Sequence, residues 1–217
     1  MSLRPSSLAA IALDLLASAL APPRCAACDA PVRRLAALCG ACAATAQRAS
    51  CSDQDVAAYV YGGAVARAIG RMKYEKRPDL ARPLGDLLWR AVEPRAAGMP
   101  DACVVPVPLH PRRLVERGYN HAALLARRLG GRLGAEVYPV ALARTRETPR
   151  QATLDRRARL SNVAQAFRAA RAGALRGRAV WLVDDVRTTG STLDACRRAL
   201  LEAGVTAVAT AVVARAE

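Results

Sequence analysis

Residues 179–192 read Ala-Val-Trp-Leu-Val-Asp-Asp-Val-Arg-Thr-Thr-Gly-Ser-Thr, and this stretch decides the fold. Its first part, Val180–Val183, is almost wholly apolar, as expected of a strand buried on both faces of a parallel sheet. The strand is expected to end at two adjacent carboxylates, Asp184 and Asp185. A loop of small hydroxylated residues with one glycine follows and opens into the helical pattern of Leu193–Leu201. This order of strand, loop and helix predicts an α/β domain in which helices flank a parallel sheet.

The chemistry of this stretch points to a sugar phosphate. Ligands of open α/β sheets bind at the carboxyl ends of the strands, where Asp184 and Asp185 are expected to lie. Carboxylates hold the hydroxyls of a polyol, and the loop offers backbone N–H groups, side-chain hydroxyls and a helix N-terminus to an anion. The alternative is a plain turn in which Asp185 only caps the helix. The glycine-rich motifs of dinucleotide-binding domains and ATPases are absent from the sequence, which argues against both classes.

Val180–Thr192 resembles the PRPP-binding motif of the type I phosphoribosyltransferases (PRPP is 5-phosphoribosyl 1-diphosphate). In that motif four hydrophobic residues precede two acidic residues and a Thr/Gly-rich loop. The resemblance implies that Asp184 and Asp185 face the ribose 2′- and 3′-hydroxyls. It also implies that the following loop wraps the 5′-phosphate; its residues are Arg187, Thr188, Thr189, Gly190, Ser191 and Thr192.

Four of the seven cysteines form the pattern Cys25-x2-Cys28-x10-Cys39-x2-Cys42. Each Cys-x2-Cys pair can turn two thiolates toward one metal ion, and two pairs complete a tetrahedral site. With all four positions thiolate, the pattern predicts a closed, structural zinc site. Disulfides, an iron–sulfur centre and a site without metal are the alternatives. The single cysteines at 51, 103 and 196 are interpreted as small buried side chains, with Cys51 as a potential remnant of a second metal ribbon.

Composition bounds the class of protein but not its partner. The 53% hydrophobic fraction of the 217 residues supports a packed core. The net charge of +15 comes almost entirely from arginine, since Lys73 and Lys76 are the only lysines. Either the genome's composition explains this charge, or the partner is an anion such as a phosphorylated substrate or nucleic acid. We expect two parts: a helix and zinc ribbon over 1–50, and an α/β domain over 51–217.

We expect the protein to be cytoplasmic, and the N-terminal segment is the feature that bears on this. Residues 8–21 imitate a signal-peptide core, but Asp14 interrupts the apolar run and Pro22 follows it. Their helical spacing of apolar residues suits an amphipathic helix docked on the domain. The sequence contains no uninterrupted apolar stretch of membrane-spanning length.

The middle of the chain alternates between strand and helix patterns. Strands are expected at 56–61, 103–109 and 137–142, and helices at 64–74, 80–92 and from about 121 to 133. Prolines at 106, 108 and 111 predict a rigid loop after the second strand. This loop carries Arg112, Arg113 and Arg117, whose planar guanidinium groups suit a diphosphate. A basic stretch without periodicity follows Arg144.

Several of these motifs together resemble the ComF family. They are Pro106-Val-Pro-Leu, Arg117-Gly-Tyr-Asn120, Arg144 with Gln151, Arg159 with Asn162 and Phe167, and Asp184-Asp-Val-Arg-Thr-Thr-Gly190. The family combines an N-terminal zinc ribbon with a domain whose parallel sheet is like that of the type I phosphoribosyltransferases. His121 stands where the family often has Gln, a departure expected to matter little.

The resemblance leaves several functions open. One is transfer of phosphoribosyl from PRPP with Mg²⁺, in which Arg144 and the residues up to Gln151 close as a catalytic lid; the acceptor is not indicated. Another is a non-enzymatic role in competence and DNA uptake, with single-stranded DNA and a helicase-type protein as partners. A third is a PRPP or nucleotide sensor.

Overall fold

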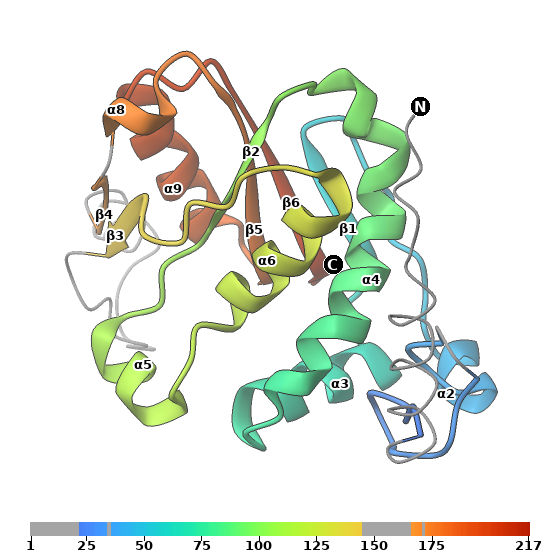
Figure 1. Ribbon diagram of the computed structural model, residues 1–217. Helices are drawn as coiled ribbons and strands as arrows, with labels where there is room; N and C mark the ends of the chain where they lie inside the picture. The colour runs from blue at the N-terminus through green and yellow to red at the C-terminus, as the bar shows by residue number, and fades with distance from the viewer. Residues whose placement is uncertain (1–21, 34–35, 145–165, 171) are drawn as a thin grey trace, which may run out of the picture.

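A four-stranded parallel sheet forms the centre of the protein (Figure 1). The computed structural model describes residues 22–33, 36–144, 166–170 and 172–217. The strands lie in the order β1-β6-β5-β2, and every neighbouring pair is parallel. Their bounds are β1 Asp55–Val60, β2 Cys103–Pro106, β5 Ala179–Arg187 and β6 Ala207–Arg215. The predicted class, a parallel sheet flanked by helices, is confirmed.

Helices cover both faces of this sheet (Figure 1). One face is covered by α4 (Ala81–Val92) and α6 (His121–Leu133), with α3 (Gly63–Tyr74) beside them. The other face is covered by α9 (Ser191–Glu202). Because successive side chains of a strand point to opposite faces, β5 feeds two cores. Trp181 and Val183 pack on the α4–α6 side, whereas Val180 and Leu182 pack on the α9 side. This is why the strand reads as a continuous apolar run.

The remaining elements are short. β3 and β4 form a separate antiparallel pair, and α8 follows β4 along the chain. The bounds are α2 Gly40–Ala44, η1 Pro78–Leu80, η2 Glu93–Gly98, α5 Pro111–Arg117, β3 Leu142–Arg144, β4 Phe167–Ala169 and α8 Ala172–Leu175. None of the helices among the described residues has the length and apolarity needed to cross a membrane.

The structure corrects three expectations about local structure. Strand β5 continues past the two carboxylates to Arg187, because its ladder with β6 extends that far. The segment carrying Arg112, Arg113 and Arg117 is the helix α5 rather than a rigid loop. Proline is tolerated in the first turn of a helix, where Pro111 lies, and the His110 side chain accepts a hydrogen bond from the N–H of Arg112. The strand expected at 137–142 is reduced to a single bridge at Val137 and to β3.

The cysteine ribbon packs directly on the α/β domain. Cys25 and Ala26 belong to the same apolar core as Ile69 and Met72 of α3. The boundary expected at residue 50 stays a prediction. The helix predicted over residues 8–21 and the basic stretch up to Gln151 after Arg144 lie outside the described residues.

Candidate functional site

The two adjacent carboxylates of β5 lie in different surroundings. The Asp185 side chain follows Trp181 and Val183 toward α3 and α6, and the residue is only 2% exposed. Its Oδ1 lies 2.8 Å from Nζ of Lys73, and its Oδ2 lies 2.8 Å from Nε2 of His121. Asp184 is partly buried, and its Oδ1 accepts a hydrogen bond from the N–H of Asp185. Asp184 is therefore the more accessible carboxylate, whereas Asp185 is already held by two side chains.

These surroundings separate the two carboxyl groups electrostatically. Burial raises the pKa of Asp184 to about 7, and the negative charge of Asp185 acts in the same direction. Burial also tends to raise the pKa of Asp185, but His121 and Lys73 outweigh it and hold that pKa below its usual range. Asp185 is therefore the more readily ionised member of the pair, and Asp184 keeps its proton to higher pH.

We expect Asp184→Asn to stabilise the protein more strongly above pH 7 than in acid. The folded-state pKa of about 7 exceeds the ordinary value of 3.8. Between these values the folded protein holds a proton that the unfolded chain has released, so the stability contributed by Asp184 falls as the pH rises through this window. Asp184→Asn has no carboxyl group to ionise, so it does not lose this stability as the pH rises. Its gain in the free energy of unfolding, measured with urea, should grow from about pH 5 to about pH 8.

A matched control is Asp101→Asn, because Asp101 is an exposed carboxyl in a turn at the other end of the sheet. We expect its effect on unfolding to be the same at both pH values. An equal effect of Asp184→Asn at both pH values would contradict the electrostatic account of the pair.

The loop between β5 and α9 has the features of an anion cradle. Gly190 adopts a left-handed conformation, with φ +81°, immediately before α9, a helix of 12 residues. The guanidinium of Arg187 lies against Gly190, since a Cβ added to Gly190 would be 3.0 Å from Arg187 Nε. The Nη1 atom of Arg187 forms an ion pair with Asp55 Oδ1 at 2.8 Å. Arg187 thus connects the loop at Gly190 to Asp55 of β1. The Thr189 and Ser191 hydroxyls lie 3.1 Å apart at the start of the helix, where N–H groups and the helix dipole favour a phosphate.

The three arginines predicted to bind diphosphate line one cavity, here called the basic cavity. Its volume is about 450 Å³, and five of its seven lining residues are Lys or Arg. They are Lys73, Tyr74, Lys76, Arg112, Arg113, Glu116 and Arg117. The Arg117 guanidinium lies over the Tyr74 ring, 5.1 Å from its centroid. Because Lys73 also contacts Asp185, the basic cavity adjoins the acidic pair.

Arg144, predicted to be catalytic, lies on the α9 side of the sheet. It belongs to β3, and its guanidinium lies 5.4 Å from the centroid of the Phe167 ring. Burial raises the pKa of Cys196 on α9; the negative charge of Asp184 raises it further, and the positive charge of Arg144 lowers it. The charges of Arg144 and Asp184 therefore both act on the thiol of Cys196. The catalytic role of Arg144 stays a prediction.

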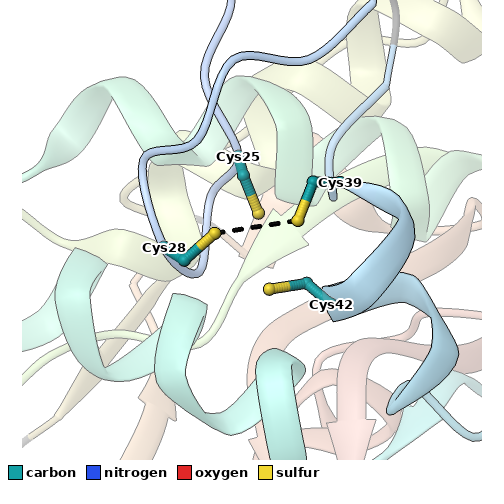
Figure 2. A group of neighbouring side chains, drawn as sticks. All are labelled: Cys25, Cys28, Cys39 and Cys42. Atoms are coloured by element: carbon teal, nitrogen blue, oxygen red, sulfur yellow. Dashed lines mark hydrogen bonds between the residues drawn. The ribbon is translucent and has the colours of Figure 1, made fainter.

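The four cysteines of the ribbon converge on one point (Figure 2). The four Sγ atoms all lie within 4.8 Å of one another, and Cys28 Sγ is 3.7 Å from Cys39 Sγ. A tetrahedral zinc site with Zn–S bonds of about 2.3 Å requires sulfur atoms roughly 3.8 Å apart. Burial would raise the pKa of Cys25, but N–H groups of Cys39, Ala27 and Cys28 outweigh it and lower that pKa to about 6. The cluster therefore fits a zinc ribbon, and none of the seven cysteines forms a disulfide.

Sequence reasoning missed two members of the site, Lys73 and His121. Both hold Asp185, yet neither belongs to the strand motif. His121 was noted only as a departure from the family's Gln; it is 5% exposed and its ring faces the carboxylate. A signal for Lys73 was present: it is one of only two lysines in an arginine-rich chain. Its approach to Asp185 depends on how α3 packs beside β5, which no local pattern reports.

Curated proteins resemble the chain over most of its length. No family model matches the chain. It is 34% identical over 188 residues to the DNA utilization protein YhgH of Escherichia coli (strain K12), a match that covers 85% of this chain and 80% of that protein. It is 32% identical over 188 residues to competence protein F of Haemophilus influenzae, with coverages of 84% and 80%. The crystal structure of TT1426 from Thermus thermophilus aligns with a TM-score of 0.37 and 20% identity, over 61% of this chain and 72% of that one.

The parallel sheet, the acidic pair with its loop and the four-thiol cluster define an α/β domain like that of the type I phosphoribosyltransferases, preceded by a zinc-ribbon-type cluster. Its identity to these relatives over most of its length shows that the chain belongs to the ComF family.

Proposed function

We propose that this protein binds PRPP, or a closely related sugar phosphate, and transfers its phosphoribosyl group to an acceptor with release of diphosphate. One observation carries the proposal: Lys73 lines the basic cavity and also contacts Asp185. A group of carboxylates suited to sugar hydroxyls and a cavity suited to diphosphate are thus neighbours. PRPP carries both chemical parts in one molecule.

The reaction places simple demands on the residues around the sugar. The bond between ribose C1 and the diphosphate oxygen breaks, the acceptor's nucleophilic atom bonds to C1, and the acceptor's proton passes to solvent or diphosphate. Positive charge develops at the sugar, so catalysis rests on positioning and on neutralising the departing group. In our proposal Asp184 and Asp185 hold the sugar, residues 187–192 hold the 5′-phosphate, and the basic cavity holds the diphosphate. Arg144 would close over the reacting atoms.

Two metal ions belong to this proposal. Cys25, Cys28, Cys39 and Cys42 would hold a structural zinc ion, and their geometry and thiol chemistry fit it. Mg²⁺ prefers oxygen ligands and binds together with substrate phosphates. His121, Asp184 and Asp185 form the nearest potential ligand group, but Asp185 already contacts Lys73. We therefore expect Mg²⁺ to enter with the diphosphate of PRPP rather than to occupy a dedicated protein site.

The names of the relatives support a second candidate function, in which the protein serves competence or DNA utilization by binding single-stranded DNA. The basic cavity and the net charge of +15 suit a phosphate backbone. Tyr74, which is 66% exposed at the edge of the cavity, offers a ring on which a base can stack. A helicase-type protein would be the partner in that role. A PRPP or nucleotide sensor would use the same pocket without turnover.

One set of titrations separates these functions. We expect PRPP with Mg²⁺ to displace a labelled single-stranded oligonucleotide at about 50 mM salt, where phosphate contacts are strong, because both ligands need the basic cavity. In parallel, a screen of nucleobases and amines with PRPP should reveal an acceptor that triggers diphosphate release. PRPP binding without release from any acceptor would favour the sensor. Simultaneous binding of both ligands would place DNA elsewhere, and absence of PRPP binding would remove the main proposal.

A further inference from the structure

Each oxygen of the Asp185 carboxylate faces a basic side chain in this structure, although the proposed function assigns this residue to the sugar. Its side chain is 3% exposed and contacts Lys73 through one oxygen and His121 through the other. A sugar hydroxyl can reach this carboxylate only if one of the two partners moves. The release of Asp185 is therefore a step that any ligand must bring about.

Both partners of Asp185 are connected to the basic cavity. Lys73 lines the cavity itself, and its side chain is 19% exposed. Arg117, another lining residue, has Nη1 3.3 Å from Nδ1 of His121. A guanidinium can only donate, so this contact is a hydrogen bond in the tautomer whose Nδ1 accepts and whose Nε2, which faces Asp185, carries the proton. An anion in the cavity thus competes with Asp185 for Lys73, and with His121 Nδ1 for Arg117.

We propose that Lys73 is a latch that couples the two halves of the site: a diphosphate group entering the basic cavity draws Lys73 away from Asp185 and frees this carboxylate for the sugar hydroxyls. The inference rests on the proposed function and adds the order of events within the site. A buried carboxylate without partners is costly, so releasing Lys73 is favourable only when sugar hydroxyls take its place. Diphosphate and sugar therefore assist each other's binding.

The latch gives the site a selectivity that separate subsites would lack. Ribose 5-phosphate alone meets an Asp185 that is still held by Lys73. Diphosphate alone can take Lys73 only by leaving Asp185 with His121 as its sole partner. A ligand with both groups satisfies Lys73 and Asp185 at once, so PRPP is favoured over its fragments beyond the sum of their separate contacts.

The test measures this coupling by isothermal titration calorimetry of the full-length protein. Magnesium diphosphate is titrated with and without saturating ribose 5-phosphate. Coupling between sites is commonly 5- to 150-fold, so we expect the sugar phosphate to tighten diphosphate binding at least about fivefold in the wild type. Reciprocity requires the same factor for ribose 5-phosphate in the presence of diphosphate. In Lys73→Gln the factor should fall to less than about twofold, since the neutral amide cannot exchange an ion pair between the two sites.

Two further variants keep the result interpretable. Lys76→Gln removes one charge from the same cavity, but Lys76 forms no ion pair with Asp185. It should weaken diphosphate binding and retain the cooperativity, which controls for charge repulsion between the two ligands. Lys73→Arg preserves a cation that can reach either partner and should also retain it. Thermal melting verifies that each variant is folded.

The outcomes distinguish the latch from the function on which it rests. Undiminished cooperativity in Lys73→Gln, or no cooperativity in a wild type that binds PRPP and both fragments, would overturn the latch alone. If neither PRPP nor its fragments bind the folded wild type, both the latch and the proposed function are wrong.

Discussion

The double variant Asp184→Asn/Asp185→Asn is expected to lose the stabilisation that PRPP and Mg²⁺ give the wild type. A ligand at 100 times its Kd adds about 2.7 kcal/mol to the free energy of unfolding. For a chain of this size that corresponds to a rise in melting temperature of roughly 5–10 °C. Both substitutions remove the negative charge that would accept hydrogen bonds from the sugar, and Asn keeps nearly the same shape. Thermal melting with and without ligand measures the difference.

The matched control for this experiment is Asp53→Asn/Asp101→Asn. It makes the same change in net charge with two exposed residues that precede β1 and β2, at the opposite end of the sheet. This control should keep the full ligand-induced shift. An undiminished shift in the Asp184/Asp185 variant would move the sugar-phosphate site away from β5, and the motif interpretation would then be wrong.

Loss of one cysteine of the ribbon is expected to have the second large effect. Protein purified without chelator should contain one zinc ion per chain, and Cys39→Ser should contain none. Structural zinc in small ribbons contributes an apparent binding free energy of about 10–16 kcal/mol at neutral pH. Because the ribbon shares its core with α3, we expect a lower melting temperature of the whole molecule and not only a loosened ribbon.

Cys51→Ser is the control for zinc, because Cys51 lies outside the four-thiol cluster and donates to the Ala57 carbonyl oxygen at 3.1 Å. It should keep the metal. Elemental analysis decides the matter, and full zinc occupancy in Cys25→Ser/Cys28→Ser would refute the assignment of these ligands.

Features encoded within a short stretch of sequence were predicted well. The apolar run before Asp184, the glycine loop and the two Cys-x2-Cys pairs are local patterns, and the structure confirms the parallel strand and the thiol cluster. Features that depend on the packing of distant elements were not predicted. Lys73 and His121 reach Asp185 only because α3 and α6 lie against the same face of β5. The gathering of Arg112, Arg113 and Arg117 in one cavity could be predicted from their clustering, but their helical backbone could not.

The strand order has a consequence for how the chain folds during synthesis. Among the four strands of the described sheet, β1 has β6 as its neighbour and β2 has β5, so the two central strands are the last to be translated. At translation rates of about 5–20 residues per second, β1 waits roughly 10–30 s for its neighbour. Long-range parallel pairing is also slow in itself. During this interval the edge of β1 that will receive β6 and the edge of β2 that will receive β5 are unpaired, and unpaired edges invite association with other chains. The two outer strands therefore exist in the growing chain before the centre of the sheet that joins them.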